Sequence, residues 1–370
     1  MRKLGRTAAL ATAGVLVATL APANAGHDHG DDDEELSTVV ELDGPRGVDA
    51  LGHGRTLVTE TDGTFSLVRE RRGQEPEVIE LGSVPGGFAP AIAAGRHGRV
   101  YILVGAAGEP DGPPPPGYAT LYEWRHGYAA PKPVFDVAAY QTTDPDPDDL
   151  EGAPTDSNPF GLAVLKDGSV LIADAGGNDL IRWYRNGDAE TVATFMPRVV
   201  TVPDSIPLPE EEVPSEAVST SVTVGPDGYW YVGELRGFPA TPGTSQIWRI
   251  KPGSVGAVCD PEKPWRGHCK RYADGLTSIM DLGADHRSIY AVSLSKMSWL
   301  VAEADPPVPG AEIGALYRLT SHHRSRHHGH HVRIRELVKD QLVLPGGVDV
   351  KGKIYVTGPV FGPGALMKIH

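Results

Sequence analysis

Residues 158–174 read Asn158-Pro159-Phe160-Gly161-Leu162-Ala163-Val164-Leu165-Lys166-Asp167-Gly168-Ser169-Val170-Leu171-Ile172-Ala173-Asp174, two short apolar runs joined by an Asp-Gly turn. The same design returns at 220–234, where two apolar runs flank the turn Gly225-Pro226-Asp227-Gly228. Short apolar runs bounded by turn residues predict strands paired in hairpins. Because the design recurs at roughly 40–50 residues, it predicts a repeat architecture of propeller or solenoid type.

Six copies of this design can be followed along the chain. They begin near Gly44, Ala89, Asn158, Thr220, Ser278 and Pro345. Each copy has three clear strands, and most have a weaker fourth, such as 77–81 and 333–338. Four antiparallel strands per repeat make a propeller blade, and blades must stack to bury their faces. We therefore expect an all-β fold, a six-bladed β-propeller with few helices.

The two ends of the repeat region complement each other. The last copy stops at His370, directly after its third strand at 365–369, and a spare strand at 38–42 precedes the first copy. Pairing between these ends would remove two open sheet edges, which otherwise invite aggregation. We expect the N-terminal strand to complete the last blade and close the ring.

The N-terminus has the features of a secretory signal. Arg2, Lys3 and Arg6 precede an apolar stretch at 8–20, and Ala23-Asn24-Ala25 is a cleavage sequence of the A-x-A type. We expect residues 1–25 to be a signal peptide cleaved near Ala25, 26–36 an acidic, His-containing disordered leader, and 37–370 a single propeller domain. The mature protein should be secreted, without a membrane span, and monomeric.

Composition narrows the classes of partner. The net charge is −14, and a nucleic-acid partner needs a basic face, so the sequence argues against one. The chain has 45 Gly and 33 Pro, which suits many short strands and turns. Its two cysteines, Cys259 and Cys269, are expected to form one disulfide in an exported protein.

Polar residues gather where the repeat places one face of the disc. In a four-stranded blade, the turn entering the innermost strand and the turn between the second and third strands lie on the same face. The ligand-binding candidates at this central mouth are Arg46, Glu60, Asn158, Asp174, Asn178, Asp179, Ser221 and Glu234. Such groups suit calcium or a polar ligand. Alternatively, the Asp and Asn residues build turns and Glu234 accepts backbone hydrogen bonds.

A histidine-rich segment lies between two predicted strands of the fifth copy. Its histidines are His322, His323, His327, His328, His330 and His331. Imidazoles at this density can bind nickel, copper or zinc, and they become cationic below about pH 6.5. The segment has no fixed ligand geometry in the sequence, so weak, adventitious metal binding is the alternative.

Three segments carry a resemblance to a known family. They are Asn158-Pro159-Phe160-Gly161, Ala173-Asp174-Ala175-Gly176-Gly177-Asn178-Asp179-Leu180, and the block from Val224 to Pro239. These segments resemble the ScyD/ScyE family of exported bacterial β-propeller proteins. The resemblance implies a six-bladed propeller related to NHL-repeat, gluconolactonase-like and streptogramin-lyase-like proteins. It implies no reaction, and no functional residue is carried over from it.

The sequence supports two main functions. The chain has no nucleophile elbow, no H-E-x-x-H and no recognisable catalytic triad. The first hypothesis is therefore a non-catalytic exported propeller that binds a small molecule or an extracellular protein at the central mouth. The alternative is a metal-dependent hydrolase or lyase of the lactonase type, with Asp174, Asn178 and Glu234 as ligands or bases. A weaker third hypothesis is metal scavenging by the His-rich segments.

Overall fold

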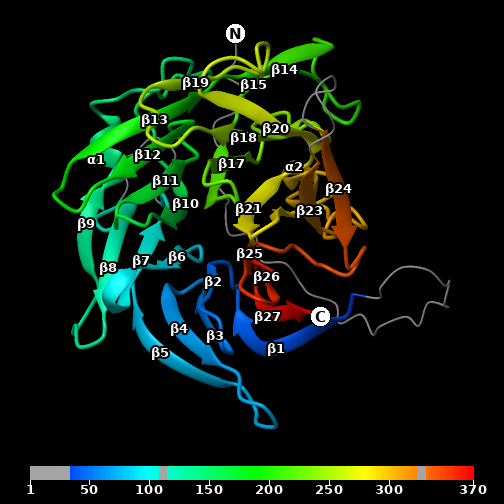
Figure 1. The fold of residues 1–370 in the computed structure, drawn as a ribbon. Helices are drawn as coiled ribbons and strands as arrows, with labels where there is room; N and C mark the ends of the chain where they lie inside the picture. The colour runs from blue at the N-terminus through cyan, green and yellow to red at the C-terminus, as the bar shows by residue number, and fades with distance from the viewer. Residues whose placement is uncertain (1–33, 108–114, 323–330) are drawn as a thin grey trace.

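The protein is a ring of six β-sheets around a central axis (Figure 1). The structure is a computed structural model and describes residues 34–107, 115–322 and 331–370. The predicted signal peptide and most of the predicted leader lie outside these residues. Each sheet is one blade, and its strands follow one another from the axis outward. The six-bladed, all-β prediction is confirmed.

The first three blades follow the chain order. Blade 1 consists of β2 (Val48–Ala50), β3 (Arg55–Thr59), β4 (Thr64–Arg69) and β5 (Glu77–Ser83). Blade 2 consists of β6 (Ala91–Ala94), β7 (Arg99–Val104), β8 (Thr120–Arg125) and β9 (Lys132–Asp136). Blade 3 consists of β10 (Pro159–Val164), β11 (Val170–Asp174), β12 (Asp179–Trp183) and β13 (Ala189–Phe195), with β19 (Ala257–Cys259) added in parallel to β13.

The remaining blades complete the ring. Blade 4 consists of β16 (Ser219–Val224), β17 (Trp230–Glu234), β18 (Ser245–Ile250) and β20 (Cys269–Leu276). Blade 5 consists of β21 (Ile279–Ala284), β22 (Ser288–Ser293), β23 (Ala315–His322) and β24 (His331–Leu337). Blade 6 consists of β25 (Gly347–Val350), β26 (Ile354–Gly358), β27 (Pro363–Ile369) and β1 (Leu36–Asp43).

Blade 6 closes the ring with strands from both ends of the chain. β1 pairs antiparallel with β27, from Leu36 opposite Ile369 to Asp43 opposite Pro363. The predicted closure is therefore confirmed, and the strand is longer than the predicted 38–42. The pairing leaves β27 without an open edge, since β26 occupies its other side.

The short helices and one hairpin lie in the connections between strands. α1 (Val137–Gln141) precedes blade 3, β14 (Arg198–Thr201) pairs with β15 (Glu212–Ser215) before blade 4, and α2 (Trp299–Ala302) connects β22 to β23. A short 3-10 turn covers 96–98. These elements lie in connections between the predicted strands. Among the described residues, no helix is long and apolar enough to cross a membrane.

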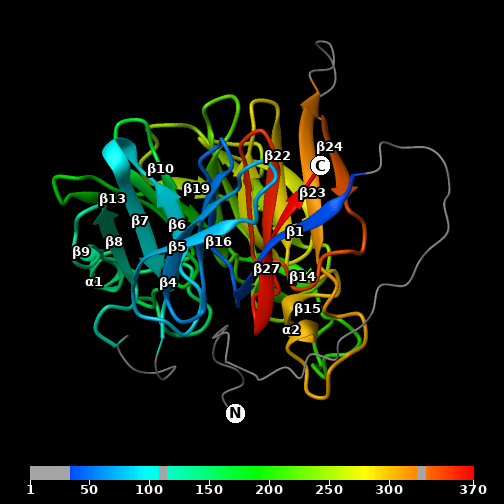
Figure 2. The same cartoon turned by 90° about the horizontal axis from the view of Figure 1, so that it is seen from below.

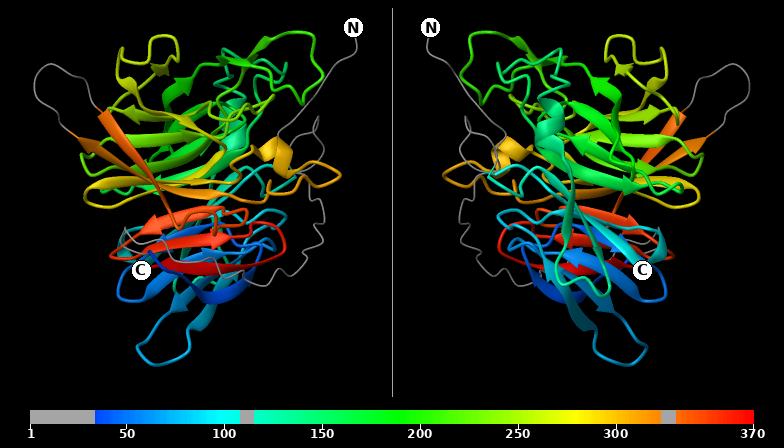
Figure 3. Two further views of the ribbon diagram at one scale, coloured as in Figure 1. Left: turned by 90° about the vertical axis from the view of Figure 1, so that its right-hand side faces the viewer. Right: turned by 90° about the vertical axis from the view of Figure 1, so that its left-hand side faces the viewer.

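The two faces of the disc carry different connections. We define the mouth face as the one where each innermost strand begins and where the second and third strands of a blade are joined, and the far face as the opposite one. The side views place α1 and α2 on the mouth face (Figures 2 and 3). The ends of β23 and β24 that flank the His-rich segment lie on the far face (Figure 2).

Apolar side chains on facing blade surfaces form the core. Phe65 of blade 1 meets Trp124 of blade 2 edge-on at a ring distance of 5.7 Å, and Tyr101 of blade 2 meets Trp183 of blade 3 at 6.1 Å. These alternating positions are the apolar residues of the repeated strand pattern, so the repeat directly encodes the blade-to-blade contacts.

Candidate functional site

The carboxylate of Asp174, at the end of β11, is fully engaged by its surroundings. One oxygen accepts the backbone N–H groups of Asn158 at 2.6 Å and Gly176 at 3.1 Å. The other accepts the Ser157 hydroxyl at 2.7 Å and the Gln141 side-chain amide at 3.2 Å. Burial raises the pKa of Asp174, and these bonds work against that rise. The geometry is that of a loop-organising carboxylate.

Two neighbours of Asp174 share this loop network. The Gln141 amide also donates to Asp179 at 3.0 Å, and burial, followed by the nearby Asp174, raises the pKa of Asp179 well above its usual value. Asn178 has a φ of 48°, accepts the Val218 N–H at 2.8 Å and donates to Asp146 at 3.0 Å. Asp179 therefore ties α1 to blade 3, whereas Asn178 joins the connections that enter blades 3 and 4.

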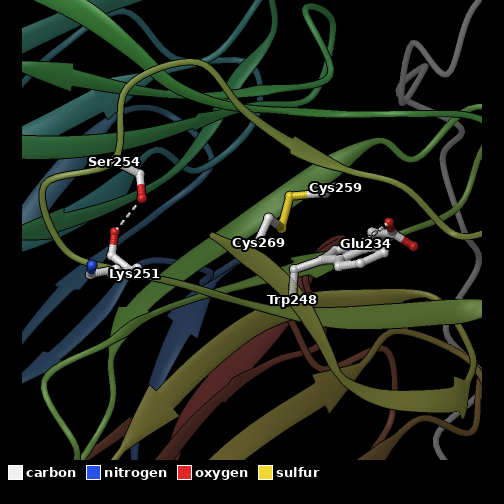
Figure 4. Close-up of a disulfide and its surroundings, with 6 residues drawn as sticks. All are labelled: Glu234, Trp248, Lys251, Ser254, Cys259 and Cys269. Atoms are coloured by element: carbon white, nitrogen blue, oxygen red, sulfur yellow. Dashed lines mark hydrogen bonds between the residues drawn. A yellow bond between two sulfur atoms is a disulfide. The ribbon is translucent and has the colours of Figure 1, made fainter. Parts of the chain in front are cut away.

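Glu234, at the end of β17, is buried and bonded within blade 4. Its carboxylate pairs with Arg236 and accepts the Trp248 indole N–H at 2.5 Å and the Gln246 backbone N–H at 3.2 Å. Figure 4 shows Trp248 beside Glu234 and near the disulfide. Burial raises the pKa of Glu234, and Arg236 lowers it. These contacts agree with the alternative in which Glu234 serves the fold.

Arg46 crosses the mouth from the entrance of blade 1. Its guanidinium donates to the Ala89 carbonyl at 3.0 Å and to the Phe160 carbonyl at 3.0 Å, and it lies 3.9 Å from the centre of the Phe160 ring. Phe88 stacks near Phe160 at 5.7 Å and near Phe361 at 6.0 Å. Burial lowers the pKa of Arg46 to about 10. The centre of the mouth is thus aromatic, with one buried cation.

The remaining predicted mouth residues are Glu60, Asn158 and Ser221. Glu60 accepts the Asp43 N–H at 2.8 Å, and the side-chain Oδ1 of Asn158 accepts the Ala106 N–H at 3.0 Å. The Ser221 hydroxyl is buried without a hydrogen-bond partner among the described residues. Most polar atoms of this set bond to protein groups. Ligand binding by the set stays a prediction.

The remaining predicted sites have different outcomes. Cys259 and Cys269 form the expected disulfide (Figure 4). His322 and His331 are paired residues at the ends of β23 and β24, and His323, His327, His328 and His330 lie outside the described residues. In the described part of the chain, no group of three or more His, Cys, Asp or Glu could hold a metal ion. Metal binding at either place stays a prediction.

The structure adds a crevice that sequence reasoning missed. It lies on the mouth face beside α2, between the inner ends of blades 3 and 4. Its polar members are Asn158, Thr220 and Glu303. Its apolar walls are Phe160, Ala175, Val218, Leu235 and Trp299. Glu303 follows α2 in a long connection without a motif, so only the packing of α2 brings it to the ring.

Two carboxylate oxygens of the mouth face are buried without a hydrogen-bond partner among the described residues, Oδ1 of Asp179 and Oε1 of Glu303. Of these two residues, Glu303 is the one that lines the crevice. Burial alone raises the pKa of Glu303 to about 7. A buried polar atom without a partner costs about 1–3 kcal/mol, so a partner supplied by a ligand or water would recover that free energy.

A second set that the sequence analysis missed lies on the innermost strands. Asp281 accepts the Val348 N–H at 2.9 Å, Asp349 accepts the Ala50 N–H at 2.7 Å, and Asp49 accepts the Ala94 N–H. Each carboxylate thus joins its own blade to the next one. The signal was available in the repeated tripeptides Gly47-Val48-Asp49 and Gly347-Val348-Asp349.

Comparison with known proteins supports the fold class and no closer assignment. No protein-family model and no curated protein matches the chain. A solved structure of a protein of unknown function from Bacteroides thetaiotaomicron is 10% identical, with 91% of this chain and 76% of that chain covered and a TM-score of 0.50. At this identity, the likeness shows the fold alone.

Two similar solved structures have described functions. A catalytically inactive virginiamycin B lyase from Staphylococcus aureus, solved with quinupristin, is 14% identical, covers 91% of this chain and 99% of its own, and has a TM-score of 0.47. Regucalcin, a calcium-binding protein from Agrobacterium tumefaciens, is 10% identical, covers 89% and 90%, and has a TM-score of 0.48. The chain is similar to these proteins as a β-propeller, and the likeness carries no activity to it.

Proposed function

We propose that this protein is an exported propeller of the ScyD/ScyE kind that binds a ligand at the mouth of its ring. The observation that carries the proposal is the buried, unpartnered oxygen of Glu303 in the mouth-face crevice. Convergent polar groups in an otherwise apolar hollow are the usual composition of a ligand site. Here the polar groups are Asn158, Thr220 and Glu303, and the apolar walls include Phe160 and Trp299.

The lactonase-type or lyase-type alternative has less support from the geometry. It requires Asp174, Asn178 and Glu234 to face a shared substrate or metal. Each of the three instead bonds to protein groups of its own or adjacent loops. A binding function needs no such set.

Two features of the chain support export, the disulfide and the N-terminal sequence. The Cys259–Cys269 disulfide belongs to an oxidising compartment, as secreted proteins do. The basic, apolar and small-residue order of 1–25 is that of a secretory signal. Both features support a mature protein outside the cytoplasm.

Blocking the crevice tests the binding proposal. Thermal unfolding of mature protein would be followed with calcium chloride and a fragment set of amines, alcohols, carboxylates and sugars. We expect a subset to raise Tm, because a ligand that binds only the folded state stabilises it by mass action. In Ala175→Leu, whose added side chain fills the crevice, those shifts should disappear. The control Ala153→Leu, in an exposed mouth-face loop, should keep them.

Two results would contradict the proposal. One is a fragment set that leaves Tm unchanged at millimolar concentration. The other is a set of shifts that Ala175→Leu and Ala153→Leu retain equally. Should Ala175→Leu fail to fold, the smaller Ala175→Val reduces the same space and serves the same comparison.

A further inference from the structure

The crevice contains a carboxyl group but no cation to neutralise it. Among its lining residues in the described chain, Glu303 is the only charged one. Loss of hydration is the sole cause of its raised pKa of about 7, so no neighbouring positive charge offsets the desolvation. A cationic donor brought by a ligand would supply both the missing hydrogen bond and the missing charge.

The size of the crevice limits what can enter it. Its cavity volume is about 20 Å³, roughly the room for one water-sized group. A primary ammonium group is of this size, whereas a quaternary ammonium is much larger. Calcium takes six to eight oxygen ligands, and one carboxylate with one amide and one hydroxyl falls short of that number. The space therefore suits a single small donor group.

One aromatic wall of the crevice suits a ligand cation. The Trp299 indole donates to the Arg236 carbonyl at 2.8 Å, and its backbone N–H donates to the Ser278 hydroxyl at 2.9 Å. These two bonds fix the ring beside Glu303. Phe160 lines the same crevice, but its ring already carries the Arg46 guanidinium. Cations are attracted to aromatic ring faces, and Trp299 is the crevice ring that offers one to a ligand.

The surrounding surface is strongly acidic. The mouth-face segments 141–157 and 203–216 carry eleven Asp or Glu residues and no Lys or Arg. Asn158 of the crevice follows the first segment, and Val218 follows the second. A surface of one sign raises the local concentration of the opposite charge and speeds its association. These acidic segments of the mouth face therefore favour cationic ligands over anionic ones.

We infer that the crevice binds the primary ammonium group of a ligand whose apolar body lies on the aromatic mouth beside it. Glu303 accepts one N–H, and the oxygens of Asn158 and Thr220 are acceptors for the others, since an ammonium has three donors. The apolar body packs on Phe88 and Phe361, which are partly exposed. This inference rests on the proposed function, and it adds the chemical class of the ligand.

Four matched probes test the inference: benzylammonium, benzyl alcohol, benzoate and benzyltrimethylammonium. Binding would be followed by the ¹⁵N-indole signals of the mature protein, with Trp299 assigned through Trp299→Phe. We expect benzylammonium to move the Trp299 signal and to bind about tenfold more tightly than benzyl alcohol, the factor typical of one charge-assisted hydrogen bond. Benzoate and the quaternary probe should leave that signal in place.

Charge-neutral variants separate the role of Glu303 from that of the pocket. Glu303→Gln should reduce benzylammonium binding to the level of benzyl alcohol and leave the alcohol unchanged. Glu312→Gln, in the same β22–β23 connection but outside the crevice, should bind as wild type does. Wild-type affinity for the amine should rise about tenfold in total as Glu303 ionises around its pKa of about 7 and should then level off, and Glu303→Gln should remove this dependence.

The outcomes distinguish this inference from the proposed function. Equal binding of the alcohol and the amine, tighter binding of benzoate, or an unchanged amine affinity in Glu303→Gln would overturn the ammonium assignment while leaving a mouth ligand site in place. A Trp299 signal that moves with none of the four probes, together with an unresponsive fragment screen, would overturn both.

Discussion

The ring has two halves that join their blades differently at the axis. The innermost strands of blades 5, 6 and 1 each carry one aspartate, which is Asp281, Asp349 and Asp49 respectively. The innermost strands of blades 2, 3 and 4 carry no acidic residue. In the first half, each carboxylate accepts an N–H of the next blade. The same ring therefore contains both titratable and neutral joints between its blades.

The acidic half makes stability depend on pH. Burial raises the pKa of Asp49 and Asp281 to about 7, and burial raises that of Asp349 too. The folded protein then holds protons that the unfolded chain releases near pH 4. Their contribution to the unfolding free energy is complete below about pH 4 and is lost as pH rises to about 7.

The largest expected effect follows from neutralising this half. Asn keeps the acceptor oxygen and removes the titration, so the triple variant Asp49→Asn, Asp281→Asn, Asp349→Asn should flatten the fall in unfolding free energy between pH 4 and 7. The difference from wild type is about 1.4 kcal/mol per pH unit for each proton held. Urea unfolding at several pH values measures it.

Other groups and a control complete that measurement. Asp174 and Asp179 of blade 3 also have raised pKa values, so the triple variant should retain part of the slope. Asp188→Asn, in an exposed turn of blade 3, should follow wild type at every pH. A triple variant with the full wild-type slope would show that the axial carboxylates do not titrate in this range.

The next effect concerns the side chain that bridges the two halves. Arg46 enters from blade 1 and donates to the Ala89 carbonyl before blade 2 and the Phe160 carbonyl of blade 3. Arg46→Met keeps much of the length and removes the donors, and it should lower the unfolding free energy by about 3 kcal/mol. Chemical denaturation at pH 8 would measure the loss.

An exposed arginine provides the matched control. Arg96 of blade 2 donates to the Lys166 carbonyl of blade 3 at 2.9 Å on the far face. Because this bond is solvent-exposed, Arg96→Met should change the unfolding free energy by less than about 0.5 kcal/mol. Equal losses for the two variants would mean that burial at the mouth adds nothing to the Arg46 bridge.

Most of the fold could be predicted from the sequence because its signals are local. Strand alternation and Asp-Gly turns such as Asp167-Gly168 mark each blade, and the missing last strand marks the closure. The candidate site depends on contacts between distant segments. Gln141 reaches Asp174 from the preceding connection, and α2 brings Glu303 to the ring. No local pattern shows whether a polar side chain faces a ligand or another loop.

The disulfide lies at the outer strands of blades 3 and 4, in the half of the ring without axial carboxylates. Cys259 ends β19, which pairs with blade 3, and Cys269 begins β20 of blade 4, ten residues later. Replacing both with Ser should cost about 2–3 kcal/mol, the range for closing a short loop, with the same cost at pH 5 and pH 8. Reduced wild-type protein should match the variant, and a reductant should leave the variant unchanged. A cost that varies with pH would show that the disulfide and the axial carboxylates contribute to stability in a coupled way.

The smallest effect compares two serines on the innermost strand of blade 4. The Ser219 hydroxyl donates to the Asp174 carbonyl at 2.8 Å, whereas the Ser221 hydroxyl is buried with no partner in the described structure. Ser219→Ala should therefore lower the unfolding free energy by about 1 kcal/mol, and Ser221→Ala should leave it equal or slightly higher. Ser221 was also predicted to bind ligand. If Ser221→Ala stabilises the protein and keeps the fragment-induced Tm shifts, Ser221 serves the neutral contact between blades in this half and does not bind the ligand. A loss of about 1 kcal/mol in Ser221→Ala would instead show that its hydroxyl has a partner at the axis, such as a bound water, and that this half is less apolar than its residues suggest.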